Sequence, residues 1–246
     1  MLFVSPEKLC SDKFVSLLRS LKIQFGFACI DEAHCVSEWS HNFRPSYLRL
    51  QHVLQNKLGI KTILAMTATA TKRTEISICQ SLSIPSNGVV RCSVIRPNLH
   101  LNASLADDRH LELIKLLNST PFSDFNSIII YCMLQRETDE LAGYLQMKGF
   151  DAVSYHAGKP PKERKRVQDQ FTKNKVRIIV ATVAFGMGLD KPDVRGVIHF
   201  SLPKSPENYI QVNNKVTCNA LNNIFCLIRK LDELAVMENQ LTATCS

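Results

Sequence analysis

The chain has 246 residues, which is enough for two modest α/β domains or one large one. Hydrophobic residues make up 45% and charged residues 21%, as in an ordinary soluble globular protein. The net charge of +8 makes a polyanionic partner plausible, but many basic proteins never contact nucleic acid.

The sequence predicts no cysteine-based zinc or redox site and no membrane or secretory segment. The nine cysteines include no C-x-x-C pair, so we expect neither a zinc site nor a redox motif, and free thiols favour a reducing compartment. No apolar run approaches the roughly 20 residues that a membrane span needs. The N-terminus has no basic region before an apolar core, which argues against a secretory signal. We therefore expect no membrane partner.

The chain begins with an apolar run at residues 1–4, which predicts a strand. Ser5 and Pro6 then form a helix start, in which serine caps the helix and proline occupies its first position.

Two carboxylates follow the short apolar run at residues 27–30, which predicts a buried strand. Asp31 and Glu32 come where this strand would end, and ligands bind at the carboxyl ends of parallel strands. An Asp there can hold Mg²⁺ through its water shell, and a Glu can orient and deprotonate an attacking water. A solvated acidic turn would show the same residues.

The segment at residues 39–47 concentrates aromatic and basic side chains in an expected loop. It contains Trp39, the only tryptophan, together with His41, Phe43 and Arg44. Aromatic faces and a guanidinium suit stacking on unpaired bases and binding of phosphate. The alternative is a loop whose aromatic rings cap the core.

Residues 47–58 predict a helix ended by Gly59, and residues 61–66 a second buried strand. This strand is followed by Thr67, Ala68 and Thr69. Hydroxyls and small side chains at such a position can transmit a structural change between two sites. A threonine-rich turn that caps the next helix is the simpler interpretation.

The second half alternates strands and helices, which predicts a parallel sheet. The helices are expected at residues 107–118, 136–148 and 162–171, and the strands at 127–132, 150–155, 176–182 and 195–202.

Two further patterns belong to this half. Thr182 ends a strand and is followed by a segment with Gly188 and Asp190, where glycine permits close backbone approach. Residues 159–166 form a basic cluster, which fits a solvated helix face, a phosphate contact or a nuclear-import signal.

Together these residues resemble the RecQ family of superfamily-2 DNA helicases. The sequence Asp-Glu-Ala-His at residues 31–34 is similar to the family's DEAH box, and residues 39–44 are similar to its aromatic-rich loop. Residues 28–30 and 40–45 most resemble the Rothmund–Thomson-type branch. The resemblance implies two RecA-like parallel-sheet domains, ATP and Mg²⁺ as cofactors, and 3′–5′ DNA unwinding in recombination, repair and replication. It also implies single-stranded or forked DNA and repair or replication proteins as partners, and a nuclear location.

The resemblance assigns a role to each matching residue. The catalytic residues would be Asp31, Glu32 and His34, with Mg²⁺ held by Asp31 through water. Thr67, Ala68 and Thr69 would couple the state of the nucleotide to DNA binding, and Gly188 and Asp190 would lie on the nucleotide side of the site. The residues expected to bind DNA are Trp39, His41, Phe43, Arg44, His156 and Thr182.

The chain departs from the family pattern at two places. The phosphate-binding sequence G-x-x-x-x-G-K-[ST] is absent, so we expect the chain to begin in mid-domain. After residue 211, where the family has a Gly-Arg-Ala-Gly-Arg string, residues 212–216 contain no arginine. Because an arginine finger contributes on the order of 10³–10⁵ in rate, we expect impaired ATP hydrolysis.

The expected organisation is the C-terminal part of a first RecA-like domain at 1–96, a linker at 97–106, a second RecA-like domain at 107–211, and a tail at 212–246 with an amphipathic helix. Two functions remain open. One is a RecQ-type helicase, and the other is a non-catalytic DNA- or partner-binding fragment from an alternative or mispredicted transcript.

Overall fold

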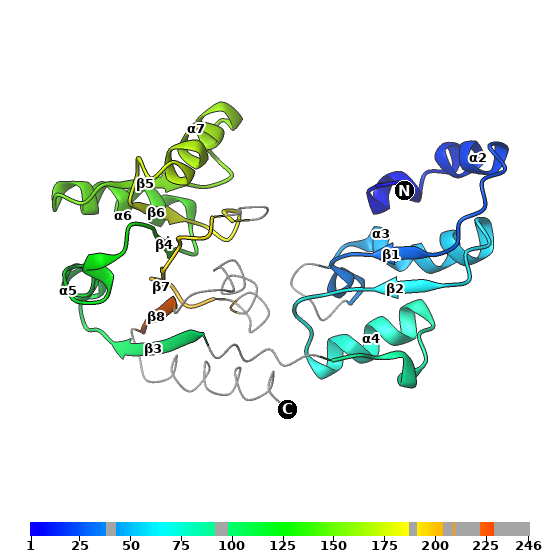
Figure 1. The fold of residues 1–246 in the computed structure, drawn as a ribbon, viewed down its shortest axis with the longest axis horizontal. Coiled ribbons are helices and arrows are strands. Elements are labelled where there is room, and N and C mark those ends of the chain that lie inside the picture. Colours follow the sequence, from blue (N-terminus) through cyan, green and yellow to red (C-terminus); the bar gives the residue numbers. More distant parts are fainter. Residues whose placement is uncertain (38–42, 92–97, 187–190, 204–208, 210–221, 229–246) are drawn as a thin grey trace. The chain divides into compact units, whose positions relative to one another are not determined.

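The structure is a computed structural model that describes residues 1–37, 43–91, 98–186, 191–203, 209 and 222–228. The chain divides into two compact units, Met1–Cys92 and Ser93–Ser246 (Figure 1). Each unit combines helices with a parallel sheet, which confirms the predicted α/β class. None of the described helices is both long and apolar enough to cross a membrane.

The first unit contains a two-stranded parallel sheet, in which β1 pairs with β2 and Cys29 lies opposite Leu64. Its elements are α1 (Pro6–Leu9), α2 (Asp12–Ser20), β1 (Ala28–Ile30), the 3₁₀ turn η1 (Ala33–Val36), α3 (Pro45–Leu48), the π-helix η2 (His52–Lys57), β2 (Ile63–Ala65), α4 (Lys72–Leu82) and the 3₁₀ turn η3 (Ser86–Gly88).

Local sequence explains where these helices begin and end. The Ser5 side chain accepts a hydrogen bond from the Lys8 amide and caps α1, and Thr71 caps α4 in the same way. The strand predicted at residues 1–4 is wrong. Met1 and Phe3 are exposed, and no described strand pairs with this segment, so nothing there satisfies the backbone groups of a strand.

The second unit contains a six-stranded sheet in the order β3-β8-β7-β4-β6-β5, with every neighbouring pair parallel. Its elements are β3 (Leu99–Leu105), α5 (Arg109–Asn118), the 3₁₀ turn η4 (Phe122–Asp124), β4 (Ile128–Tyr131), α6 (Gln135–Met147), β5 (Ala152–Tyr155), α7 (Pro161–Thr172), β6 (Ile178–Ala181), β7 (Gly196–His199) and β8 (Asn222–Ile228).

The central strands β4, β6 and β7 are buried along their whole length, because helices cover both faces of the sheet. Ile129 faces one core, into which α7 inserts Val167 and Phe171. Ile128 faces the opposite core, which α5 and α6 complete. This sandwich fixes the carboxyl ends of β5 and β6, where the predicted site residues lie.

Two expectations about the ends of this unit are wrong. The linker predicted at 97–106 contains β3, an edge strand of the sheet. The helix predicted in the tail is replaced over Asn222–Ile228 by β8, which lies between β3 and β7. Ile224 and Cys226 join one core and Phe225 packs against the other, which is the two-residue period of a strand. The remainder of the predicted tail helix lies outside the described residues.

Candidate functional site

The predicted catalytic carboxylates form a tight turn directly after β1. Asp31 and Glu32 are both exposed, and the Glu32 amide donates to Asp31 Oδ1 at 2.9 Å. Glu32 has a φ of 51°, in the left-handed region that costs a residue with a Cβ roughly 1–2 kcal/mol. Strained backbone of this kind persists where surrounding contacts hold it, often at functional sites.

Hydrogen bonds that continue beyond the strands hold this turn against β2. The Met66 amide donates to the Ile30 carbonyl, and the Ala33 amide donates to the Met66 carbonyl, both at 2.9 Å. The next residue, His34, is only 2% exposed. Its Nδ1 lies 2.9 Å from Thr67 Oγ1 and 3.3 Å from Glu32 Oε2. The carboxylate turn and the threonine loop at residues 67–69 are therefore one hydrogen-bonded unit.

The Thr67 hydroxyl fixes the direction of this network. It donates to the Thr69 carbonyl at 2.9 Å, and it accepts from the Thr69 amide at 3.2 Å. A hydroxyl has a single proton, so toward His34 it must act as acceptor. The proton of the imidazole therefore lies on Nδ1, which also points it toward the carboxylate of Glu32. Ala68, between the two threonines, is exposed.

The end of the aromatic segment is bonded to the same turn. The Arg44 amide donates to the Cys35 carbonyl at 3.0 Å, and Tyr47 Oη donates to the Asp31 carbonyl at 3.3 Å. Burial raises the pKa of Tyr47, so its hydroxyl keeps the proton that it donates. Sequence reasoning missed this role of Tyr47. Arg44 itself is exposed and Phe43 is half-buried, while the predicted DNA-binding residues Trp39 and His41 lie outside the described residues.

The carboxylates fit a hydrated Mg²⁺ better than a metal held by side chains alone. The described residues contain no group of three or more His, Cys, Asp or Glu side chains that could hold a metal ion. Asp31 and Glu32 are exposed neighbours, and Mg²⁺ is usually bound by one or two carboxylates, with waters and substrate phosphates as the other ligands. Asp31 would hold the ion through water, and ATP would supply the phosphates.

In the second unit, His156 follows β5 directly and is 7% exposed. Its Nε2 lies 3.0 Å from Asp139 Oδ2, while its buried Nδ1 has no hydrogen-bond partner among the described residues. Asp139, on α6, also accepts from Ser154 Oγ at 2.6 Å. Gly158 permits close packing beside the imidazole, because a Cβ there would clash with Gln135 Oε1 and lie 3.1 Å from His156 Nδ1.

The charge of Asp139 follows from these contacts. Burial alone would raise its pKa, but the hydrogen bond from Ser154 and the interactions with His156 and Lys159 outweigh it and hold the pKa below its usual value. Sequence reasoning missed Asp139, since nothing near it in the chain marks it as a partner for a side chain on β5.

Thr182 lies beside His156 at the same edge of the sheet. Its amide donates to the Tyr155 carbonyl at 3.3 Å, and β5 and β6 are paired so that Tyr155 lies opposite Ala181. The structure thus brings together two of the residues predicted to bind DNA. Gly188 and Asp190, predicted on the nucleotide side, lie outside the described residues.

Comparison with known proteins identifies the relatives of this chain. The helicase conserved C-terminal domain matches residues 110–217. ATP-dependent DNA helicase Q-like 5 of Arabidopsis thaliana is 49% identical over 213 residues, covering 86% of this chain and 23% of the relative. ATP-dependent DNA helicase Q4 of Homo sapiens is 44% identical over 200 residues, covering 75% and 17%. ATP-dependent DNA helicase RecQ of Pasteurella multocida is 38% identical over 211 residues, covering 86% and 32%.

A solved structure agrees with the fold. That of S. cerevisiae Dbp5 bound to RNA and ADP BeF3 superposes with a TM-score of 0.69 at 17% identity, covering 94% of this chain and 61% of that one. The chain spans less than a third of the length of the curated relatives named above. It belongs to the RecQ family of helicases, of which it is a partial chain that carries the conserved C-terminal helicase domain.

Proposed function

We propose that this chain is part of an ATP-dependent DNA helicase that moves 3′–5′ on single-stranded or forked DNA, in nuclear recombination, repair or replication and together with proteins of those processes. The names of its relatives, ATP-dependent DNA helicases, support the reaction class. The observation that carries the proposal for this chain is the hydrogen bond between His34 and Thr67, because it joins a carboxylate pair to a loop on the neighbouring strand.

The network gives each residue of the first unit a task. ATP with Mg²⁺ supplies the phosphoryl group that water attacks. Glu32 orients that water and takes its proton, and the Nδ1 proton of His34 holds the Glu32 carboxylate in place. A shift of Glu32 during hydrolysis would move His34, and through Thr67 the loop that leads to α4.

DNA contact is coupled to the same turn through the aromatic segment. Arg44 would bind phosphate, and its backbone is bonded to Cys35 in the turn η1. Trp39, His41 and Phe43 would stack on unpaired bases. In the second unit, His156 and Thr182 would contact the DNA backbone at the carboxyl ends of β5 and β6, and Gly188 and Asp190 would face the nucleotide.

A second function is favoured for the 246-residue chain by itself. It contains no G-x-x-x-x-G-K-[ST] sequence and no arginine at residues 212–216, so two groups that stabilise the transferred phosphoryl group are missing. We propose that this polypeptide binds DNA without hydrolysing ATP at an appreciable rate.

The test combines hydrolysis and binding. We expect no DNA-stimulated ATPase activity above that of Glu32→Gln, and salt-sensitive binding of a labelled single strand that is lost in a variant carrying Trp39→Ala and Arg44→Ala. Stimulated hydrolysis that Glu32→Gln abolishes would show that the chain is catalytic. A folded wild-type chain with no affinity for single strands would refute DNA binding at the aromatic segment.

A further inference from the structure

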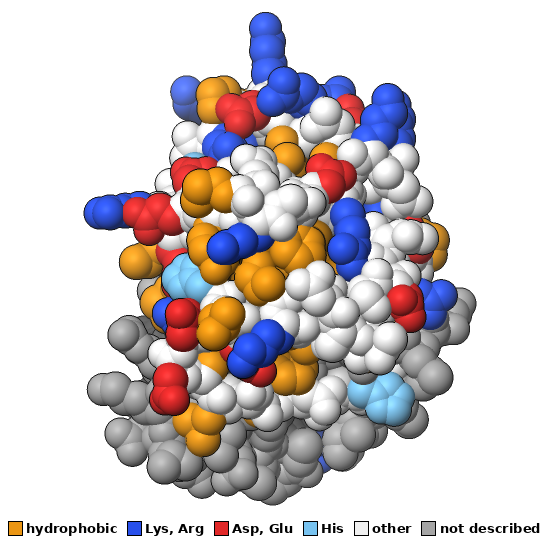
Figure 2. Space-filling model, turned by 90° about the vertical axis from the view of Figure 1, so that its left-hand side faces the viewer, with side chains coloured by type: hydrophobic (Ala, Val, Ile, Leu, Met, Phe, Trp, Pro, Cys, Tyr) orange, Lys and Arg blue, Asp and Glu red, His pale blue; other side chains and the backbone are white. Residues whose placement is uncertain are grey.

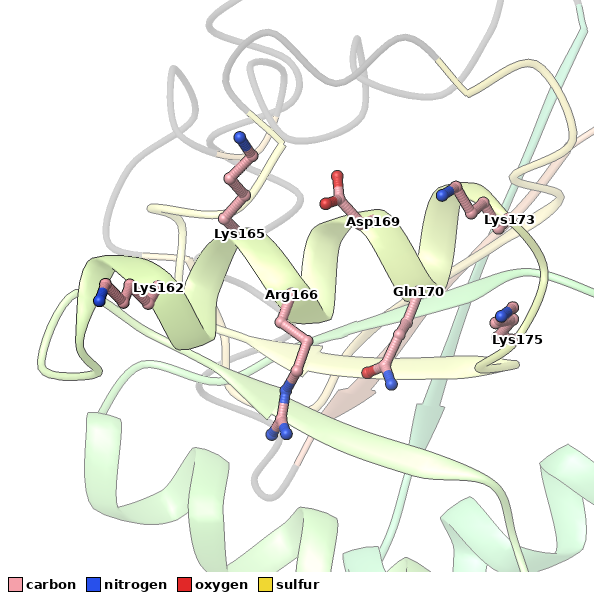
Figure 3. Close-up of a pocket in the computed structure, with 7 residues that line it drawn as sticks. All are labelled: Lys162, Lys165, Arg166, Asp169, Gln170, Lys173 and Lys175. Atoms are coloured by element: carbon pink, nitrogen blue, oxygen red, sulfur yellow. The ribbon is translucent and has the colours of Figure 1, made fainter.

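The outer face of α7 carries a row of cations that the proposed mechanism does not use. Lys162, Lys165 and Arg166 lie three and one residues apart on one side of the helix, Lys173 is its C-terminal capping residue, and Lys175 follows. Figure 3 shows these side chains and those of Asp169 and Gln170 around a surface depression of about 300 Å³. Lys and Arg side chains also gather at the upper end of the face in Figure 2, the end at which Figure 1 places α7.

These five cations, which we call the α7 patch, have few counter-charges among the described residues. Elsewhere in the unit Lys115 pairs with Glu112, Arg136 with Glu140, and Lys191 with Asp193. Within the described part of the chain, no member of the patch has an ion pair, and Asp169 is the one carboxylate among the lining residues. Five cations against one carboxylate leave an exposed net charge of +4 over residues 162–175.

The patch is rigid because the opposite side of α7 is buried. Val167 and Phe171 are 3% and 0% exposed, and both belong to the core beneath the sheet. Eleven residues of helix rise by about 16 Å, the axial length over which one strand of a DNA duplex carries about five phosphates. The cations are thus held along a line of matching length.

The chemistry of the patch argues against other partners. None of the seven lining residues is apolar, whereas protein interfaces are anchored by aromatic and aliphatic side chains. A helix that lies on a membrane needs a free apolar face, and the apolar residues of α7 are already buried. A surface that is charged and forms no ion pair among the described residues suits a phosphate backbone.

We propose that the α7 patch is a second nucleic-acid contact that binds the phosphate backbone of duplex DNA. This goes beyond the proposed function, which assigns DNA contact to the aromatic segment and to the carboxyl ends of β5 and β6. The contact needs neither ATP nor any residue of the carboxylate turn, so it can be tested separately from both.

The test compares two variants of the full chain with equal changes of charge. Lys165→Glu with Arg166→Glu reverses two cations of the patch, and Lys13→Glu with Arg19→Glu reverses two exposed cations of α2. Binding of a labelled 20-base-pair blunt duplex (about two helical turns) is measured by fluorescence anisotropy across a salt series. Circular dichroism and a thermal melt verify that each variant is folded.

We expect the patch variant to lose at least about tenfold in duplex affinity and to flatten the slope of log affinity against log salt by about 2, since each phosphate contact contributes about 0.9. The α2 variant should change duplex affinity by less than about threefold, because it alters only the overall electrostatic field of the protein. Equal losses in both variants, no loss in the patch variant, or full competition by polyglutamate at equal charge would each overturn the proposal. Because a single-stranded probe tests the aromatic segment in parallel, failure of either proposal is recognised independently.

Discussion

The substitution Thr67→Val tests whether the carboxylate turn and the threonine loop form one network. Valine has the shape of threonine without its hydroxyl, so the change removes the contacts with His34 and Thr69 and leaves packing almost unaltered. We expect the free energy of unfolding of the first unit to fall.

The expected loss is about 2 kcal/mol. A net hydrogen bond contributes about 1 kcal/mol, and a buried polar group that loses its partner costs about 1–3 kcal/mol. His34 is 2% exposed, which favours the upper part of this range, but its Nδ1 keeps Glu32 Oε2 at 3.3 Å, which lowers the cost. A loss of 2 kcal/mol would raise the unfolded fraction roughly 30-fold.

Urea unfolding followed by the fluorescence of Trp39 measures this loss, because Trp39 is the only tryptophan and belongs to the first unit. The matched control is Thr62→Val, because the hydroxyl of Thr62 is exposed and has no hydrogen bond to any described residue. The free energy of unfolding of this variant should stay within about 0.5 kcal/mol of wild type. Equal midpoints for the two variants would refute the network. So would a double-mutant cycle with His34→Ala in which the two losses simply add.

The remaining predictions concern the second unit. Because the folded chain holds the pKa of Asp139 below its usual value, the ionised carboxylate stabilises the fold above about pH 4 and this contribution disappears as the pH falls further. Asp139→Asn should therefore be less stable than wild type at pH 7, and the difference should shrink as the pH falls below about 4; a constant difference in urea midpoints would contradict this. Gly196→Ala should cost about 1–3 kcal/mol, because its Cβ would lie 2.9 Å from the buried ring of Phe122. Gly143→Ala, in α6 with open space around its Cα, should instead stabilise by about 0.5–1 kcal/mol, and thermal melts that rank the two alanines the other way would be inconsistent with the packing described.

The sequence predicted those elements whose signals are local. The apolar runs of β4, β6 and β7 indicate strands because both faces of the sheet are covered, and Gly149, with a φ of 85°, ends α6 as a glycine beyond a helix commonly does. The edge strand β3 had a usable signal, since Leu99–Leu105 alternates apolar and polar residues almost regularly.

Other features could not be predicted because they arise from distant pairing. β8 is a short apolar run that fits a helix or a strand equally well, and its pairing with β3, about 120 residues earlier in the chain, decides the matter. The bond from Asp139 to His156 joins a helix to the following strand end, and only the packing of α6 on β5 creates it. The position of the carboxylates after β1, by contrast, could be predicted from the sequence. It required only the length of the apolar run and the rule that ligands bind at the carboxyl ends of parallel strands.

Two of the buried histidines, His34 and His156, are fixed by partners of different kinds, which sets what each can do. His34 donates its Nδ1 proton to a hydroxyl, whereas His156 presents Nε2 to a carboxylate that is ionised at neutral pH and can only accept. The proton of a neutral His156 therefore lies on Nε2, and its Nδ1, which has no partner among the described residues, is an acceptor. Asp139 thus fixes the orientation of the imidazole ring, so this carboxylate positions His156 for the proposed DNA contact.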